Sequence, residues 1–329
     1  MIAQLPEPVI KPNEVLIQVH SCGLCGTDLS LYHGNAALIE RFRPRFPLIV
    51  GHEFAGRVVK CGTSVSRVKV NEWVTVNPHL FCGTCAACTR GEEEICIRRP
   101  ILAWDRPGGA AEFVAVRQEN AYVLEEYVAR SVGALGEPLA VAIHAVERLR
   151  VDGSERVCIV GAGPIAFLIA VACQEKGVAS ITVFGRPQDA RRLDLIAGLG
   201  VSTAISGGDE REQDLADVMF DAGGTAASFA FAMRQTRPGG RVGALGIPPS
   251  AVELDLPELV LSEKTVVGAR GYSDKSWRQT VAVLGHRREE LQLLITHRVG
   301  LESVNEAMAL LESGVGGKVF LEPGLRKAD

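Results

Sequence analysis

Hydrophobic and polar residues follow two different patterns along this chain of 329 residues. In the first part, short apolar segments stand between glycine, proline and asparagine residues, at 15–20, 57–61 and 73–76. Segments of this length between turn residues are typical of short β-strands. A glycine-rich turn and a further apolar segment at 108–116 are expected to form the strand that closes the barrel. The first part is therefore predicted to form an irregular β-barrel.

A second pattern begins near Gly153, where continuous apolar segments alternate with helical periodicity. Alternating strands and helices predict a doubly wound parallel sheet. Two helices and a last strand beyond residue 275 are expected to return to the first part. We therefore divide this α/β chain into a domain over 1–140, completed by 275–329, and a dinucleotide-binding type of domain over 141–274. The expected strands are 156–160, 180–184, 217–221, 241–246, 265–269 and 318–321, and the expected helices are 164–173, 226–235, 277–284 and 303–312.

Composition and charge exclude several classes of protein. The formal net charge of −4 gives no electrostatic basis for binding nucleic acid or an anionic membrane. The chain has no uncharged apolar segment of 18 residues, and its first residues lack the basic and apolar regions of a signal peptide. We therefore expect a cytoplasmic protein whose partner is a small molecule.

Four of the nine cysteines fall within fifteen residues, and these are Cys82, Cys85, Cys88 and Cys96. An odd number of cysteines without a secretory signal argues against a disulfide framework. Four thiolates at this spacing can close a tetrahedral zinc site with no open position, which is typical of structural zinc. The alternatives are four unrelated loop cysteines and a zinc module that binds nucleic acid. The acidic segment 92–94 in the same loop opposes the second alternative.

A second group of candidate metal ligands surrounds His52 and Glu53, which are neighbours in the chain. A neutral imidazole beside a carboxylate can form half of a zinc site. Cys25 is a third candidate, because the polar residue Thr27 and an aspartate follow it closely. Cys22, the other member of the C-x-x-C pair, is expected to pack in the core. A redox pair is the alternative, but it requires a thioredoxin-like context that the surrounding pattern does not indicate.

Glu137 is a carboxylate in an apolar segment, immediately before Pro138. Proline is favoured in the first turn of a helix, so a helix is expected to begin here. A carboxylate at that place is stabilised by the helix dipole, which is the structural alternative to a functional role.

A glycine-rich turn joins the strand expected at 156–160 to the helix that follows it, and its residues include Gly161, Gly163, Pro164 and Ile165. Strand, G-x-G-x-x-A and helix together form the dinucleotide-binding fingerprint. The glycines allow the backbone to approach a pyrophosphate at the helix N-terminus. We therefore expect a nicotinamide dinucleotide to bind here.

The end of the next strand predicts which nicotinamide cofactor is preferred. An Asp or Glu at this place binds the ribose hydroxyls of NAD. Here the chain has Gly185 and Arg186, with Arg191 close by. The two arginines favour NADP. The alternative is that Arg186 is a solvated loop residue and that NAD binds.

Taken together, these motifs resemble the zinc-containing medium-chain dehydrogenase/reductase family over nearly the whole chain. The segment Gly136-Glu137-Pro138-Leu139 is similar to the polyol and threonine dehydrogenase branch. The resemblance implies a GroES-like barrel and a Rossmann domain. It also implies that Cys25, His52 and Glu53 hold a catalytic zinc, with Glu137 as a ligand in some states or as a hydrogen-bond partner of the water on the zinc. The same resemblance makes the four-cysteine loop a structural site, so two Zn²⁺ are expected per chain.

The resemblance also implies an activity. Hydride is expected to pass between a secondary alcohol and NAD(P), with Thr27 on the proton relay and a ketone as product. Sugar alcohols, cyclitols and amino alcohols are the expected substrates, and a homodimer or homotetramer is the expected assembly. The family often has histidine where Ser30 stands, so His33 or a chain of waters is expected to replace it. The alternatives are a zinc-independent enone reductase of the same fold and a non-catalytic redox sensor that binds zinc and nucleotide.

Overall fold

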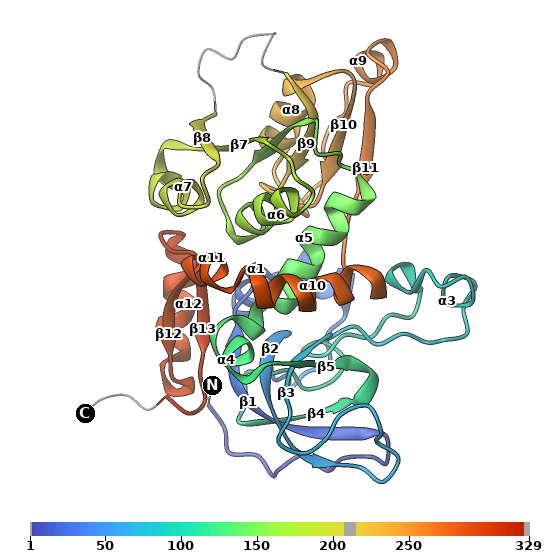
Figure 1. The fold of residues 1–329 in the computed structure, drawn as a ribbon, viewed down its shortest axis with the longest axis vertical. Coiled ribbons are helices and arrows are strands. Elements are labelled where there is room, and N and C mark those ends of the chain that lie inside the picture. The colour runs from blue at the N-terminus through green and yellow to red at the C-terminus, as the bar shows by residue number, and fades with distance from the viewer. Residues whose placement is uncertain (1, 207–214, 326–329) are drawn as a thin grey trace. The chain divides into compact units, whose positions relative to one another are not determined.

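The computed structural model describes residues 2–206 and 215–325, which form two compact units (Figure 1). The first unit comprises Met1–Glu137 and Ser273–Asp329, and the second comprises Pro138–Tyr272. The boundary between them therefore falls inside helix α5 (Gly136–Arg148), directly after Glu137. Among the described residues, no helix is long and apolar enough to cross a membrane.

The first unit is organised around a seven-stranded sheet in the order β12-β13-β1-β2-β3-β5, with β4 also paired to β1. The pairs are antiparallel except for β12 with β13. Buried aliphatic side chains from β1, β2, β3, β4 and β13 form its core. The strands are β1 (Glu14–Gly23), β2 (Glu53–Cys61), β3 (Trp73–Val76), β4 (Phe113–Arg117), β5 (Ala121–Leu124), β12 (Ile295–Val299) and β13 (Lys318–Leu321).

Strand β1 is central because it pairs with three other strands. Its register against β2 sets Gly23 opposite Glu53, and its register against β13 sets Gly23 opposite Phe320. The end of β1, the start of β13 and the start of β2 therefore meet at one place in the sheet. This is where the chain segments around Cys25, His52 and Lys318 come together.

Short helices complete the first unit, and several were not expected from the sequence. The helices at 277–284 and 303–312 were expected, and they occur as the longer α10 and the closely matching α12. The other helices are too short to show helical periodicity. The expected helices are α10 (Asp274–His286) and α12 (Val304–Ser313), and the others are α1 (Gly26–Tyr32), α2 (Ala36–Phe42), α3 (Ala86–Thr89), α4 (Glu126–Val132) and α11 (Arg288–Leu293).

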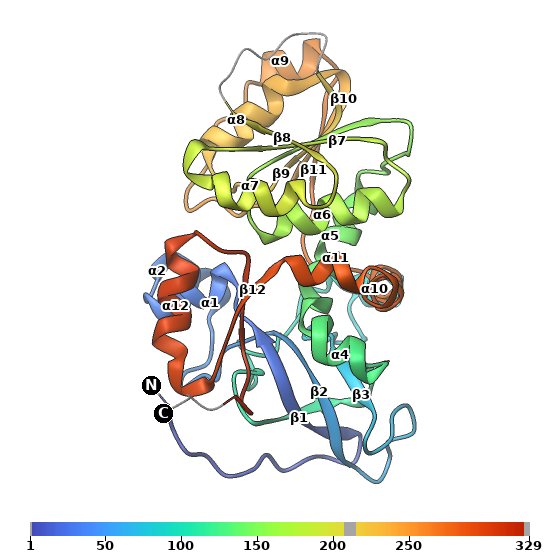
Figure 2. The same ribbon diagram turned by 60° about the vertical axis from the view of Figure 1, so that its left-hand side comes forward.

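The second unit is a six-stranded parallel sheet in the order β11-β10-β9-β6-β7-β8. Counted along the chain, this is the strand order typical of dinucleotide-binding folds, with its switch point between β6 and β9. Helices α6 and α7 cover one face of the sheet and α8 the other (Figure 2). The elements are β6 (Arg156–Val160), α6 (Pro164–Glu175), β7 (Ser180–Gly185), α7 (Ala190–Ala197), β8 (Ser202–Ile205), β9 (Ala216–Asp221), α8 (Ala226–Gln235), β10 (Thr236–Ala244), α9 (Leu256–Leu261) and β11 (Thr265–Gly268).

Several details of the second unit differ from the sequence-based expectation. Strand β8 and helices α7 and α9 were not expected, and β10 begins at Thr236 rather than at 241. The segment Pro238-Gly239-Gly240 interrupts the pairing of β10 with β9, because the register shifts between Thr236 and Arg241. The glycines and proline therefore act as an irregularity within a strand.

Candidate metal centres and cofactor site

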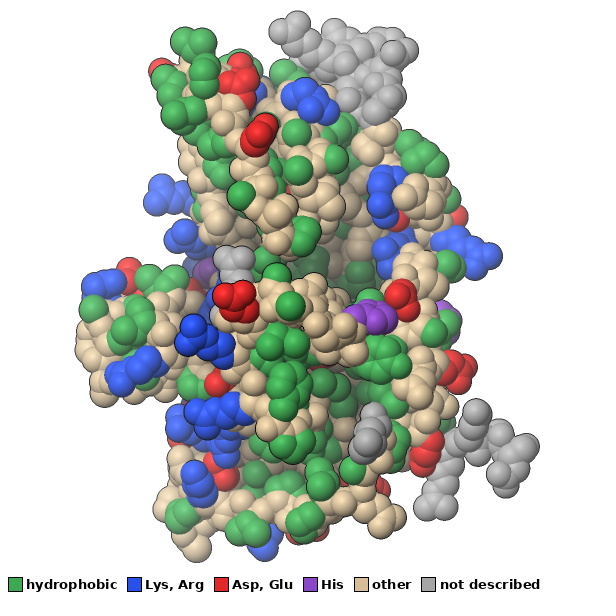
Figure 3. All heavy atoms as spheres, turned by 180° about the vertical axis from the view of Figure 1, so that it is seen from behind, with side chains coloured by type: hydrophobic (Ala, Val, Ile, Leu, Met, Phe, Trp, Pro, Cys, Tyr) green, Lys and Arg blue, Asp and Glu red, His purple; other side chains and the backbone are tan. Residues whose placement is uncertain are grey.

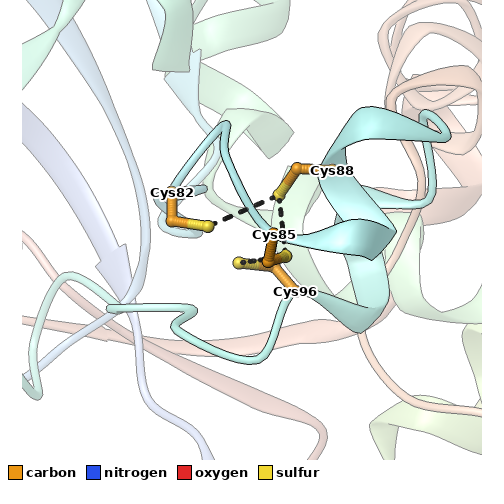
Figure 4. Close-up of side chains that lie close together, drawn as sticks. All are labelled: Cys82, Cys85, Cys88 and Cys96. Carbon is orange, nitrogen blue, oxygen red and sulfur yellow. Dashed lines mark hydrogen bonds between the residues drawn. The ribbon is translucent and has the colours of Figure 1, made fainter.

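The four loop cysteines lie together around a small space (Figure 4). The Sγ–Sγ distances are 3.9 Å between Cys82 and Cys88, 3.5 Å between Cys85 and Cys88, and 3.9 Å between Cys85 and Cys96. Four sulfurs at ~2.3 Å from a tetrahedral zinc are about 3.8 Å apart, so the observed spacing fits that ion. The distances are far longer than the ~2.0 Å of a disulfide. The donor set and its geometry therefore fit a structural zinc.

Backbone groups prepare two of these thiols for metal binding. The backbone N–H of Thr84 and that of Cys85 point to Cys82 and lower the pKa of its thiol to about 5. The backbone N–H of Cys88 acts in the same way and lowers the pKa of Cys85. Burial and the neighbouring thiols raise the pKa of Cys88 to about 12. Without a cation the loop therefore resists a negative charge on Cys88, which a bound dication would stabilise.

A second cluster forms where β1 ends and β2 begins. One donor atom each from Cys25, His52 and Glu53 lies within 4.8 Å of the others. Cys25 is the residue before α1, and Glu53 is the first residue of β2. Thiolate, imidazole and carboxylate are all zinc ligands, so the donor set fits a catalytic type of site.

Asp28 connects the two chain segments of this cluster. Its Oδ2 accepts a hydrogen bond from the Cys25 backbone N at 2.9 Å, and its Oδ1 accepts one from the Gly51 backbone N at 3.2 Å. Oδ1 also lies 3.8 Å from His52 Nδ1. Burial disfavours the imidazolium, but Asp28 and Cys25 outweigh it and raise the pKa of His52 well above its usual value. Asp28 thus holds the two chain segments together through backbone hydrogen bonds, and its charge faces the His52 ring without a hydrogen bond to Nδ1.

Gly51 gives the backbone the conformation that brings His52 into this cluster. Its φ is +87°, and a Cβ there would lie 2.3 Å from the sulfur of Cys22. Cys22 itself is fully buried in the core of the first unit. A side chain at position 51 would therefore displace either the core or the backbone that carries His52.

Lys318 is a member of the cluster that the sequence did not predict. Its Nζ donates to both carboxylate oxygens of Glu53 and to the backbone oxygen of Leu24 at 3.1 Å. Lys318 and Glu53 are 3% and 1% exposed, so this is a fully buried ion pair. A lysine at the start of the apolar segment 318–321 was the only signal in the sequence, and it does not identify the partner.

Glu137 is buried at the start of α5 and is not among the three residues that share the 4.8 Å cluster. Burial raises the pKa of its carboxyl group to about 7, and Glu53 adds to this shift while His52 opposes it. The two neighbours therefore act electrostatically on Glu137, as expected for a carboxylate close to the cluster.

The residues expected on the proton relay differ in their surroundings. Thr27 Oγ1 is buried and has no hydrogen-bond partner among the described residues. Ser30 Oγ donates to the Gly26 backbone oxygen of its own helix at 3.0 Å. His33 lies at the end of α1, with Nε2 3.3 Å from Glu312. An unsatisfied buried hydroxyl such as that of Thr27 is uncommon and is typical of a place where a ligand binds.

The glycine-rich turn of the second unit follows β6. Gly161 has φ +108°, and a Cβ there would lie 2.9 Å from the backbone N of Gly223, in the loop after β9. Gly163 precedes α6 and has open space around it, and Pro164 is the first residue of that helix. This turn leaves room for a pyrophosphate at the N-terminus of a twelve-residue helix. The residues therefore fit a dinucleotide.

The loop beside this turn is held by Asp221, the last residue of β9. Its Oδ1 accepts hydrogen bonds from the backbone N of Gly223 at 3.0 Å and of Gly224 at 3.3 Å. Burial raises the pKa of Asp221. This carboxylate was not singled out in the sequence, although a polar residue at the end of a central parallel strand commonly lies near the ligand.

Arg186 and Arg191 lie after β7 and on α7. Arg186 forms a forked ion pair with Asp189, with Nε–Oδ2 at 3.0 Å and Nη2–Oδ1 at 3.2 Å. The Arg186 side chain is 64% exposed, and Arg191 is exposed as well. No carboxylate occupies the last position of β7, which is Gly185.

Basic, acidic and apolar side chains are interspersed on the face drawn in Figure 3. This mixture, like the net charge of −4, does not provide the extended basic surface that a phosphate backbone requires.

Comparison with known proteins identifies the family. Residues 11–126 match the model of the alcohol dehydrogenase GroES-like domain, and residues 130–319 match that of the glucose dehydrogenase C-terminus. The L-threonine 3-dehydrogenase of Symbiobacterium thermophilum is 32% identical over 340 residues, which cover 99% of this chain and 95% of the relative. The chain belongs to the zinc-containing medium-chain dehydrogenase/reductase family.

Solved structures agree with this assignment. Galactitol-1-phosphate dehydrogenase from Escherichia coli superposes with a TM-score of 0.88 at 26% identity, covering 98% of this chain and 96% of that one. A structure from Sinorhizobium meliloti 1021 that is bound to NADP has a TM-score of 0.86 at 26% identity, covering 98% and 94%. The predicted family, α/β fold class and enzyme class are confirmed. The chain is a zinc-dependent oxidoreductase that transfers hydride between an alcohol and a nicotinamide cofactor.

Proposed function

We propose that the enzyme oxidises a secondary alcohol bearing further hydroxyl or amino groups, at a zinc held by Cys25, His52 and Glu53. The observation that carries this proposal is the 4.8 Å cluster of one donor atom from each residue. Relatives named for threonine and galactitol 1-phosphate support this substrate class. Glu137, with a pKa near 7, would join as a ligand in some states or hydrogen-bond the group that occupies the open position.

Each residue of the site would have a separate role in the reaction. Zn²⁺ would supply a Lewis acid that lowers the pKa of the substrate hydroxyl. The unpartnered buried hydroxyl of Thr27 supports a role as the first acceptor of the released proton. Asp28 would keep the segments that carry Cys25 and His52 in register, through its hydrogen bonds to the backbone N of Cys25 and of Gly51. The nicotinamide dinucleotide would bind at Gly161, Gly163, Pro164 and Ile165 and accept the hydride.

Two finer features belong to the same proposal. Cys82, Cys85, Cys88 and Cys96 would hold a second, structural zinc, because their sulfur spacing fits a tetrahedral site. NADP would be preferred to NAD, with Arg186 and Arg191 near the 2′-phosphate. The similar structure that is bound to NADP supports this preference.

Metal analysis and a substrate screen test the proposal directly. We expect about two zinc per chain and oxidation of one class among diols, polyols and amino alcohols, faster with NADP than with NAD. Cys25→Ser should abolish turnover and remove one zinc while the circular dichroism spectrum is retained. Cys61→Ser is the control, because Cys61 is a partly buried free cysteine outside both clusters. One zinc per chain and no turnover with either cofactor would instead favour the redox-sensor alternative.

We also infer that the enzyme assembles as a homodimer or homotetramer. Helix α9 exposes three large apolar side chains, Leu256, Val260 and Leu261, of which Leu261 is 84% exposed. Exposed apolar groups gathered on one helix are typical of a protein interface. Light scattering should give two or four times the chain mass of 35.2 kDa. Leu261→Glu should lower that mass, and a monomeric wild type would refute the inference.

A further inference from the structure

Asp189 and Arg186 form an unusual pair because the carboxylate is the fixed member. Asp189 Oδ2 accepts hydrogen bonds from both the backbone N and the Nε of Arg186, each at 3.0 Å. The Asp189 side chain is 9% exposed, whereas that of Arg186 is 64% exposed. The buried carboxylate is therefore anchored to the backbone, and the guanidinium is held from one edge.

This pair lies beside the glycine-rich turn. Strands β6 and β7 are parallel neighbours, and the backbone N of Gly161 donates to the Phe184 oxygen at 2.8 Å. Arg186 is two residues beyond Phe184, so both features stand at the same carboxyl edge of the sheet. In a fold with this strand order, the ribose next to the adenine is bound at that edge.

The fork leaves part of the guanidinium available. An arginine has five N–H donors, and the pair uses the Nε–H and one Nη2–H. Of the remaining three donors, one on Nη1 and one on Nη2 share the next edge of the guanidinium, and that edge can bind a phosphate with two parallel hydrogen bonds. Because Asp189 already restricts the long side chain, less rotamer freedom is left to lose when a phosphate binds.

A third charge offsets the carboxylate. Arg186 is the main cause of the lowered pKa of Asp189, and Arg192 adds to the shift through its charge. Arg186, Asp189 and Arg192 together carry a net charge of one positive unit, and Arg191 on the same helix adds another. The group therefore remains attractive to a dianionic phosphate despite its internal ion pair.

We propose that Asp189 is a positioning residue for cofactor choice, which fixes Arg186 so that its free edge binds the 2′-phosphate of NADP. This inference rests on the NADP preference proposed above. It assigns to a carboxylate, a group that normally repels phosphate, a positive contribution to phosphate binding. Asp189 acts through Arg186 and does not itself contact the cofactor.

The test compares two pairs of variants at opposite edges of one sheet. Asp189→Ala and Arg186→Ala change the proposed pair. Asp217→Ala and Arg237→Ala are the matched controls, since Arg237 Nε lies 2.6 Å from Asp217 Oδ1 at the amino ends of β9 and β10. The zinc-loaded protein is titrated with NADPH and NADH by nicotinamide fluorescence. Competition by 2′,5′-ADP and by 5′-AMP then isolates the contribution of the 2′-phosphate.

Arg186→Ala should weaken the binding of NADPH and of 2′,5′-ADP by about tenfold or more, because two charge-assisted hydrogen bonds to the phosphate are lost. Asp189→Ala should weaken the binding of the same two ligands by roughly threefold to tenfold, because Arg186 remains but its side chain is no longer fixed by an ion pair. The affinities for NADH and 5′-AMP should change by less than about twofold in both variants, because neither ligand has a 2′-phosphate. The two control variants should leave the ratio of NADPH to NADH affinity as in the wild type.

The outcomes separate the two proposals. If Arg186→Ala leaves the NADPH to NADH ratio unchanged, the proposed NADP preference is wrong. If Arg186→Ala lowers that ratio but Asp189→Ala leaves it unchanged or raises it, only the role of Asp189 is overturned. Equal weakening of both cofactors by Asp189→Ala would show a purely structural residue and would also overturn the inference. Asp189→Asn, which keeps the size and one acceptor, should fall between wild type and Asp189→Ala.

Discussion

Lys318 donates to both carboxylate oxygens of Glu53 from a position 265 residues further along the chain. Burial alone would lower the pKa of Lys318, but the charge of Glu53 outweighs it and raises that pKa above its usual value. The lysine is therefore an ammonium ion inside the first unit. It compensates the charge of Glu53 in a cluster that also contains Cys25 and His52.

Lys318→Met should destabilise the protein, because it leaves the Glu53 carboxylate buried without a partner. Removal of one member of a buried ion pair costs about 3–5 kcal/mol. Urea unfolding of the zinc-loaded protein measures this loss, and zinc retention against a chelator should fall as well. Lys318→Arg keeps the charge and should lose less. The double variant Glu53→Gln with Lys318→Met should recover part of the stability, and an unchanged urea midpoint for Lys318→Met alone would contradict the role of the pair.

Gly23→Ala tests the same pair from the neighbouring strand. A Cβ at position 23 would lie 2.4 Å from Glu53 Oε2, so the carboxylate must move away from Lys318. Forcing a side chain into a packed site typically costs about 1–3 kcal/mol. We expect a lower melting temperature and a reduced turnover number. Gly26→Ala is the matched control, since a Cβ there meets nothing within 4 Å and should be nearly neutral. Equal melting temperatures and turnover numbers for the two variants would show that the Glu53 carboxylate can move without loss of stability or activity.

Cys96→Ser should remove the structural zinc and leave the first cluster in place. The loop 82–96 has few apolar contacts beyond its own cysteines, so the proposed metal would be its main source of stability. The melting temperature should fall by about 5 °C or more, as loss of a few kcal/mol predicts for a chain of this size. Metal analysis should show one zinc fewer per chain. An unchanged melting temperature with the full zinc content would refute the assignment.

Glu137 should give the metal-free protein a pH-dependent stability. Burial raises its folded-state pKa to about 7 from 4.5, so the folded chain binds more protons than the unfolded chain between these values. The resulting stabilisation is complete below pH ~4.5 and is lost as the pH rises through about 7. Its size is on the order of 3 kcal/mol. Urea unfolding of metal-free wild type and Glu137→Gln at pH 5.5 and 8 measures it. The wild type should lose more stability than the variant over this interval, and parallel losses would contradict the shift.

The parts of the molecule that could be predicted are those whose signals are local in the sequence. The cysteines at 82–96 and the glycines at 161 and 163 lie in single loops, and their spacing alone indicates a metal site and a dinucleotide turn. Apart from β8, the strands of the parallel sheet were predictable because each contains a continuous apolar segment. Strand β8 was missed because it is only four residues long and two of its residues are exposed.

The ion pair of Glu53 and Lys318 could not be predicted for a physical reason. It depends on the register of β1 against two strands that are far apart in the sequence. Neither residue has a local pattern that identifies the other, and the steric fit of Gly23 beneath the carboxylate appears only in three dimensions. The same holds for Asp189, whose effect on Arg186 depends on the conformation of a short turn.

The first unit is built from the two ends of the chain, and this imposes an order on its synthesis. Glu53 leaves the ribosome long before Lys318, and the whole of the second unit, Pro138–Tyr272, is translated in the interval. Because domains fold as units while the chain is still growing, the parallel sheet can be complete while the first sheet still lacks β13. The carboxylate beside Cys25 and His52 therefore lacks the counter-charge of Lys318 until the whole second unit and the chain up to residue 318 have been translated.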